Sequence, residues 1–198
     1  MSEHYFSSEP TSASRPRSFE LTVGGVSVSF NSDAGVFSAD RVDRGSRVLL
    51  EALLRLRDWN GVRTLDIGCG YGAIGVTLAK AGASVVMCDV NERALALCRE
   101  NVRLNGVSAV CAESDAGDGM EGPFDAVVTN PPIRAGKKTV YAFFDNAFGM
   151  LKTGGELFVV IRRQQGAESA EKHIREFFGN CETIEKEAGY RVLHSVKG

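Results

Sequence analysis

The feature that most constrains the fold begins at Val62, where short runs rich in β-branched residues alternate with longer segments whose apolar residues have helical spacing. Such alternation is typical of βαβ units, in which helices connect parallel strands and cover the sheet. The runs predict strands at residues 62–67, 84–89, 108–112, 124–129 and 156–161, and helices at residues 73–81, 91–104, 139–151 and 169–178. We therefore expect an α/β fold with a mostly parallel sheet.

Further elements flank this pattern. Strands predicted at residues 182–187 and 190–196 meet at Ala188-Gly189, which favours an antiparallel pair at one edge of a seven-stranded sheet. Near the start, residues 19–23 and 26–30 alternate apolar and polar side chains across Gly24-Gly25, a pair that suits a two-residue hairpin turn. Residues 43–57 have helical spacing, with Asp43 or Ser46 as the expected N-cap.

The length of 198 residues favours a single domain. In this prediction residues 1–42 form an N-terminal segment with the hairpin, and residues 43–198 form the core. Residues 1–17 are rich in Ser and Pro and lack a hydrophobic period, which is typical of a tail. No apolar run has the length of a membrane span or the character of a signal peptide, so we expect a cytoplasmic location without membrane contact.

Composition excludes some classes of site. The five cysteines form no CxxC pair and the three histidines lack metal-ligand spacing, so no metal site is predicted. A formal net charge of −2 gives no overall field that attracts nucleic acid. Any RNA-binding surface must therefore be a local basic patch.

A glycine-rich loop follows the first core strand, at Asp66-Ile67-Gly68-Cys69-Gly70-Tyr71-Gly72, and precedes a predicted helix. Glycines allow tight turns and close approach to a ligand, and the helix start offers free N–H groups. Gly68, Cys69, Gly70 and Gly72 are thus candidate ligand contacts. Because residues 70–75 also match the GxGxxG pattern of dinucleotide enzymes, an NAD-dependent oxidoreductase is one alternative.

Three acidic residues favour a different nucleotide. Asp66, just before the glycines, would repel a pyrophosphate and attract a cationic amino group, and S-adenosylmethionine carries an amino group and a sulfonium but no phosphate. Asp89, followed by Val90, ends the second strand and suits the ribose hydroxyls. Asp115 follows the third strand beside Ser114 and suits the adenine amino group. Ligands in such sheets bind at the carboxyl ends of strands, so these residues should converge on S-adenosylmethionine.

The strand at residues 124–129 runs into Asn130-Pro131-Pro132-Ile133. An exocyclic amine or amide nitrogen is a poor nucleophile because its lone pair is delocalised, so its methylation requires acceptors that draw the NH₂ group out of conjugation. The Asn130 side-chain oxygen and the Pro131 carbonyl would supply two such acceptors, held rigid by the prolines. We therefore predict a catalytic motif at residues 130–133.

On these motifs the chain resembles the class I methyltransferases of the small-domain group, which contains the ribosomal RNA guanine-N2 methyltransferases, and looks most like its compact bacterial members. The resemblance lies in residues 4–6, 35–38, 43–46, 66–72, 89, 130–133, 165–166 and 189–193. It implies a Rossmann-like fold, S-adenosylmethionine as cofactor and guanine N2 of ribosomal RNA as substrate. It also implies that residues 35–38, Gly45 and Ser46 border the pocket and that the N-terminal segment orders over it.

The sequence departs from this family in two respects. The larger ribosomal RNA enzymes have an additional N-terminal methyltransferase-like domain that helps to hold RNA, which we do not expect here. Their motif often ends in an aromatic residue, whereas Ile133 offers no π face to a base, so Phe37 or Tyr71 would have to stack on it instead.

Basic residues predict where RNA would bind. Arg134, Lys137 and Lys138 directly follow the catalytic motif, and Arg162-Arg163 end the fifth core strand. Because both segments follow strand carboxyl ends, they should rim the same pocket and contact phosphates of ribosomal RNA or of the small ribosomal subunit.

Three other functions are weighed against this prediction. A protein glutamine methyltransferase would use the same motif, although those enzymes usually have Tyr at its end and a helical N-terminal domain. A non-catalytic module that binds RNA or the cofactor would retain the glycine loop without turnover. The oxidoreductase is disfavoured by Asp66 and by the catalytic motif. The acceptor group, whether guanine, adenine or glutamine, stays open at this point.

Overall fold

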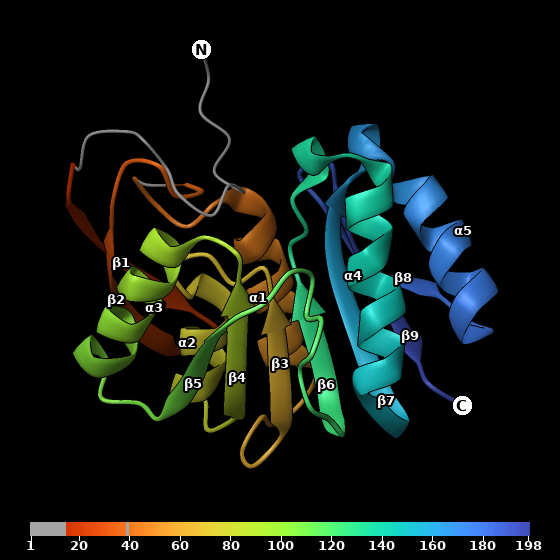
Figure 1. The fold of residues 1–198 in the computed structure, drawn as a ribbon, viewed down its shortest axis with the longest axis horizontal. Helices are drawn as coiled ribbons and strands as arrows, with labels where there is room; N and C mark the ends of the chain where they lie inside the picture. Colours follow the sequence, from red (N-terminus) through yellow and green to blue (C-terminus); the bar gives the residue numbers. More distant parts are fainter. Residues whose placement is uncertain (1–14, 39) are drawn as a thin grey trace.

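The computed structural model describes residues 15–38 and 40–198. Its centre is a seven-stranded sheet of order β5-β4-β3-β6-β7-β9-β8 (Figure 1). The five strands β5, β4, β3, β6 and β7 are parallel to one another, whereas β9 is antiparallel to its neighbours β7 and β8. This topology confirms the predicted fold class. The strands are β3 (Arg63–Ile67), β4 (Ser84–Asp89), β5 (Ala109–Glu113), β6 (Phe124–Thr129), β7 (Leu151–Arg162), β8 (Glu182–Glu187) and β9 (Tyr190–Val196).

The direction in which the chain adds strands reverses between β3 and β6. From β3 the chain adds β4 and β5 on one side, and from β6 it adds β7 on the other. Such a switch point leaves a crevice outside the carboxyl ends of the two central strands. The glycine loop follows β3 and the Asn-Pro-Pro motif follows β6, so this topology brings the two motifs together.

Helices cover both faces of the sheet. One layer contains α1 (Arg44–Leu56), α2 (Ala73–Lys80) and α3 (Glu92–Leu104), and the other contains α4 (Lys137–Met150) and α5 (Ala167–Phe178) (Figure 1). Successive side chains of β7 point to opposite faces of the sheet and so contribute to the hydrophobic core on each side. Phe158 and Val160 pack against the first helix layer, and Leu157 and Val159 pack against the second. Across the described ranges, no helix has the length and apolar character of a membrane span.

The N-terminal hairpin packs beside α3 instead of joining the sheet (Figure 1). It consists of β1 (Arg17–Val23) and β2 (Val26–Ser32), joined through Gly24 and Gly25, both with positive φ, as predicted. Asn101 Oδ1 accepts from Asn31 N at 2.7 Å and Asn101 Nδ2 donates to Asn31 O at 2.9 Å. Asn105 makes the same pair of bonds with Ser29 at 2.9 and 2.7 Å. Side-chain amides thus bond to the outer edge of β2 as a neighbouring strand would.

Several elements begin earlier than predicted, β7 and α4 among them. Strand β7 starts at Leu151, which pairs with Phe124. The prediction placed its start at residue 156, because the Gly154-Gly155 pair interrupts the apolar pattern although it does not end the strand. Helix α4 starts at Lys137, directly after Gly136 with φ of 94°, so Lys137 and Lys138 lie in its first turn and not in a loop. The expected ordering of residues 1–14 over the pocket lies outside the described residues.

Candidate active site

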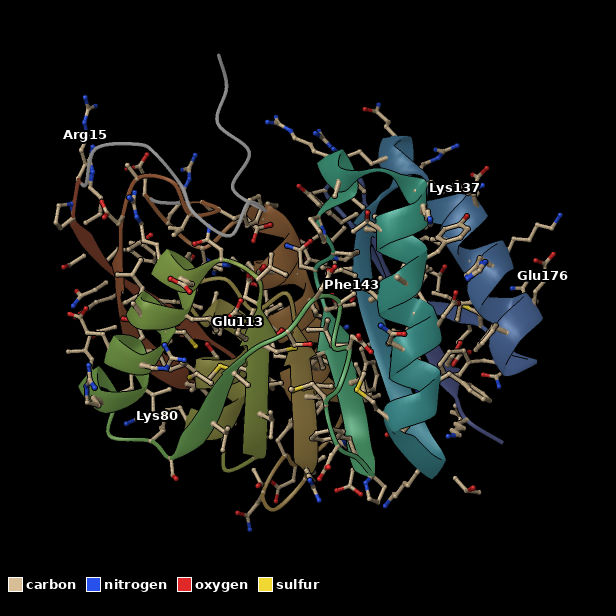
Figure 2. The ribbon with its side chains drawn as sticks, viewed as in Figure 1. Arg15, Lys80, Glu113, Lys137, Phe143 and Glu176 are labelled. Atoms are coloured by element: carbon tan, nitrogen blue, oxygen red, sulfur yellow. The ribbon has the colours of Figure 1, made fainter. Side chains whose placement is uncertain are left out.

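A cavity of about 460 Å³ opens at the carboxyl ends of β3, β4, β5 and β6. It brings together residues that the sequence predicted separately for the cofactor, the catalytic motif and the substrate. These are Phe37, Ser46, Gly68, Cys69, Gly70, Tyr71, Asp89, Val90, Ser114, Asp115, Asn130, Pro131 and Pro132. Helix α4 forms one wall, and Figure 2 shows Phe143 on its sheet-facing side, below Lys137 at the helix start.

The glycine loop is tied to the neighbouring strand β4. Gly68 N and Cys69 N both donate to the Cys88 carbonyl, at 2.8 and 3.0 Å, and Gly70 N donates to Asp89 Oδ2 at 2.8 Å. Gly70 has φ of 56°, and no atom lies within 4 Å of the place where a β-carbon would stand. Its left-handed backbone, and not crowding, therefore accounts for glycine at this position.

Asp66 lies behind the loop and does not line the cavity, which differs from the expected direct contact with an ammonium group. Its side chain is fully buried, and Oδ2 accepts from Gly75 N at 2.8 Å in the first turn of α2. Burial raises the pKa of Asp66 to about 7, against the lowering effect of the Gly75 hydrogen bond and with a smaller raising effect of Asp89. The carboxyl group therefore joins β3 to α2.

Gly75, the third glycine of the GxGxxG pattern, serves packing. A β-carbon there would stand 2.4 Å from Met87 Sδ and 3.1 Å from Asp66 Oδ2. Gly72 has a similar part, because it is the N-cap of α2 with φ of 94° and lies outside the cavity lining. These glycines shape the turn from strand to helix without facing the cavity.

The cavity is nonetheless acidic. Its lining contains the carboxyl groups of Asp43, Asp89 and Asp115 and no Lys, Arg or His from the part of the chain that the structure describes. Burial raises the pKa of Asp89, opposed by hydrogen bonds from the backbone N–H groups of Asn91, Gly70 and Val90. An acidic, cation-free lining disfavours a pyrophosphate and favours a positively charged ligand. The preference for a positively charged ligand, which the sequence analysis derived from Asp66, is therefore explained by Asp43, Asp89 and Asp115 instead.

Asn130 is held by the start of α1. Its Nδ2 lies 3.2 and 3.3 Å from the two carboxylate oxygens of Asp43 and 3.0 Å from Ser46 Oγ. Asp43 is the N-cap of α1, accepting from Gly45 N at 2.9 Å and from Ser46 N at 3.2 Å. Because the amide nitrogen points toward α1, Asn130 Oδ1 is left as a hydrogen-bond acceptor at the cavity.

Gly45 is buried behind this cap and does not line the cavity. A β-carbon on it would stand 2.9 Å from Tyr190 Cε1 and 3.1 Å from Asp43 Oδ1. Glycine here is needed for the close packing of α1 against β9, and this packing supports the position of Asp43.

The predicted stacking residues differ in exposure. Tyr71 lines the cavity but is only 3% exposed, and its ring centroid lies 5.9 Å from that of Phe19 and 5.6 Å from that of Phe30, so most of its ring packs in the core. Phe37 lines the cavity and is 39% exposed. Of the two aromatic residues, Phe37 is the one placed to meet a substrate.

The basic residues lie outside the cavity. Ile133 and Lys137 line a second groove of about 250 Å³ between α4 and α5, while Arg134 and Lys138 are exposed beside it. No ion pair within the described ranges involves Arg134, Lys137 or Lys138. The three cations thus form a basic rim next to the catalytic motif, on the side of the second groove, and none of them lines the cavity that they were predicted to border.

The sequence favoured Asp43 or Ser46 as the helix cap, and the structure shows Asp43 in that position, but the contact of Asp43 with Asn130 was missed. The two residues are 87 positions apart, and nothing in local periodicity relates them. A usable signal was present, because Asp43 precedes Gly45 and Ser46, which were expected to border the pocket. Other lining residues not predicted are Ala73, Ile74, Ala94, Ala116, Ala135, Thr139 and Phe143, which are ordinary helix and loop residues in the sequence.

Comparison with known proteins gives a consistent result. The model of the family described as "Methyltransferase small domain" matches residues 27–194. The uncharacterised protein YbxB of Bacillus subtilis is 40% identical over the full length of both chains. Ribosomal RNA small subunit methyltransferase C of Vibrio parahaemolyticus is 32% identical over 91% of this chain and 53% of that protein.

A solved structure is also similar. The 16S rRNA N2 G1207 methyltransferase of T. Thermophilus, in complex with AdoMet and guanosine, matches with a TM-score of 0.85 and 34% identity, covering 92% of this chain and 51% of that one. The chain thus spans about half the length of these two ribosomal RNA methyltransferases. The fold, the motifs and these matches together show that the chain belongs to the methyltransferase small domain family of S-adenosylmethionine-dependent methyltransferases.

Proposed function

We propose that this chain transfers a methyl group from S-adenosylmethionine to the exocyclic amine of a nucleobase, guanine N2 of ribosomal RNA. The observation that carries the proposal is the orientation of Asn130, whose nitrogen is bound by Asp43 and Ser46 while its oxygen has no hydrogen-bond partner among the described residues, in a side chain that lines the cavity. The similarity to methyltransferases that act on ribosomal RNA supports the choice of substrate.

The cavity fits the cofactor in size and charge. Its volume of about 460 Å³ is in the range of small-molecule sites, and its acidic lining suits a ligand with a sulfonium and an ammonium group. In this proposal the backbone of Gly68 to Gly70 and Ser46 contact the amino-acid part, Asp89 binds the ribose hydroxyls, and Ser114 with Asp115 binds adenine. When bound, the cofactor supplies an electrophilic methyl group.

Asn130 and Pro131 would activate the target amine. Each accepts one N–H of the NH₂ group, through the Asn130 side-chain oxygen and the Pro131 carbonyl. These bonds draw the nitrogen out of conjugation as the new N–C bond forms and the S–C bond breaks, and they strengthen while the nitrogen carries positive charge, before it loses one proton. Pro131 and Pro132 restrict the backbone, so the acceptors need little reorganisation.

The rim favours RNA over a peptide substrate. Lys137 and Lys138 lie in the first turn of α4, where the helix dipole disfavours cations, so their position does not serve helix stability. Together with Arg134 they would contact phosphates, and Phe37 would stack on the flipped base. Arg162 and Arg163 are exposed at the end of β7 and would extend this surface.

The test combines binding and product analysis. Calorimetry should show binding of S-adenosylmethionine and S-adenosylhomocysteine but not of NAD. Mass spectrometry of ribosomal RNA nucleosides, from a strain lacking the gene with and without complementation, should show one N2-methylguanosine that depends on the protein. A methylated glutamine in a protein, with unchanged RNA nucleosides, would establish the glutamine methyltransferase instead.

A further inference from the structure

We infer that Asp43 is a positioning residue for catalysis, which fixes the Asn130 amide in the orientation that presents oxygen, and not nitrogen, to the reacting amine. The inference rests on the proposed function, because it concerns the same acceptor. It starts from the distances of 3.2 and 3.3 Å between Asn130 Nδ2 and the two oxygens of Asp43.

The two ends of an asparagine amide have nearly the same shape, so packing by itself does not select one orientation. Rotated by half a turn, Asn130 would present an NH₂ group to the NH₂ group of the base, and two donors would face each other. The orientation of this side chain therefore decides whether the motif assists or opposes methyl transfer.

Asp43 distinguishes the two orientations, whereas Ser46 does not. A carboxylate only accepts hydrogen bonds, so it binds the amide nitrogen and repels the amide oxygen. The hydroxyl group of Ser46, 3.0 Å from Asn130 Nδ2, donates or accepts and would tolerate either end. The charge and the acceptor-only character of Asp43 thus fix the direction of the amide.

The position of Asp43 is itself fixed from two sides. Its Oδ1 accepts from Gly45 N and Ser46 N at the start of α1, and Gly45 leaves no room for a side chain because Tyr190 packs against it. Two roles of Asp43, capping α1 and orienting Asn130, therefore have to be separated by experiment.

Asp43→Asn and Asp43→Ser separate them, because Asn and Ser cap helices about as well as Asp. In Asp43→Asn, the side-chain oxygen still caps α1 and the NH₂ group faces Asn130, which favours the rotated amide. We expect kcat to fall by a factor on the order of 10² in Asp43→Asn and about tenfold in Asp43→Ser, which removes the charge without adding a donor. The Kd for S-adenosylhomocysteine should change by much less than kcat, because Asp89 and Asp115 keep the lining acidic, and the Tm should stay as in wild type.

A reciprocal exchange supplies the rescue. Asn130→Asp places two carboxylates at the contact that now measures 3.2 Å, and their repulsion should displace the acceptor. The double variant Asp43→Asn with Asn130→Asp restores one donor and one carboxylate at this contact, with an oxygen still facing the cavity. The single-turnover rate of the double variant should be at least tenfold higher than that of Asn130→Asp alone.

Asp58→Ser is the matched control, since Asp58 is exposed, accepts from Asn60 N at 3.0 Å and precedes β3 at the opposite edge of the sheet. Wild-type kcat in Asp43→Asn, or failure of the exchange to recover activity, would overturn the inference. A raised Kd in the Asp43 variants at unchanged kcat would also overturn it, by making Asp43 a cofactor contact. Wild-type turnover in Asn130→Ala would refute the proposed catalytic motif itself, a result distinct from these.

Discussion

Asp89 accepts a hydrogen bond from Gly70 N at 2.8 Å, so the end of β4 holds the glycine loop that follows β3. The other carboxylate oxygen accepts from Asn91 N at 2.9 Å, beside the start of α3. One side chain thus connects two adjacent strand ends and still lines the cavity. Because a carboxylate has about four lone-pair sites, both bonds leave capacity for ribose hydroxyls.

Removal of this group should weaken cofactor binding. Asp89→Ala is expected to reduce the binding free energy of S-adenosylhomocysteine by about 1.5–3 kcal/mol, the usual size for hydrogen bonds to a charged acceptor. Calorimetry measures the change. Asp125→Asn, at the amino end of β6 on the opposite edge, is the control and should bind with wild-type affinity. Equal affinities of Asp89→Ala and wild type would exclude the ribose from this position.

Loss of the proposed acceptor should appear in turnover and not in cofactor binding. Asn130→Ala removes a group that bonds most strongly to the reacting nitrogen in the transition state, so kcat should fall by a factor on the order of 10² to 10³. Single-turnover methylation of RNA measures the rate, and calorimetry with S-adenosylhomocysteine on the same preparation should give an unchanged Kd. If the rate equals that of wild type, residues 130–133 form a turn without catalytic function.

The buried Asp66 should make stability depend on pH. Its folded-state pKa is raised from 3.8 to about 7, so between these values the unfolded chain releases the proton and the folded chain keeps it. The unfolding free energy should therefore fall as pH rises from about 4 to 7, by about 4 kcal/mol for this group, and then level off.

Asp66→Asn lacks this titration while retaining an acceptor for Gly75 N. Urea unfolding of both proteins across this pH range isolates the effect, because other titrating groups cancel in the difference. Relative to wild type, the variant should gain stability steadily up to about pH 7. A difference that does not change with pH would show that the carboxyl group is already ionised at pH 4.

The basic rim should make RNA binding sensitive to salt. Ala substitutions of Arg134, Lys137 and Lys138 should each reduce the slope of log K against log salt by about one unit, or somewhat less on single-stranded RNA. Filter binding at several salt concentrations gives the slope, with Lys172→Ala on the exposed side of α5 as the control. Unchanged RNA affinity in the triple variant would favour a protein substrate.

Periodicity predicted most of the fold because strands and helices of this architecture carry distinct apolar repeats. The bounds of β4, β6, β8 and β9 agree with the structure residue for residue. It failed for β7, where two glycines obscure the start of the strand, and at the start of α4, where Gly136 begins a helix that has no polar side-chain cap.

The structure brings to the cavity the predicted residues that follow strand ends, but not the predicted residue that is buried behind the loop. Asp89, Ser114 and Asp115 converge because parallel strands end at one edge. Asp66 also lies near the end of its strand, one residue before Ile67, but its side chain faces the layer that contains α2. The charge pattern of the sequence does not reveal in which direction a side chain points. The link between Asp43 and Asn130 arises from tertiary packing over 87 residues, which no local pattern encodes.

The amide contacts of the hairpin have a consequence for synthesis. Ser29 and Asn31 emerge from the ribosome long before the side chains that bind them, which lie 76 and 70 residues later in the chain. A two-stranded hairpin is marginally stable by itself, and these bonds to β2 can form only after α3 has been made. Asn101 Nδ2 also donates to the Tyr71 carbonyl at 2.9 Å. The arrival of one helix therefore supplies hydrogen bonds to both the hairpin and the glycine loop.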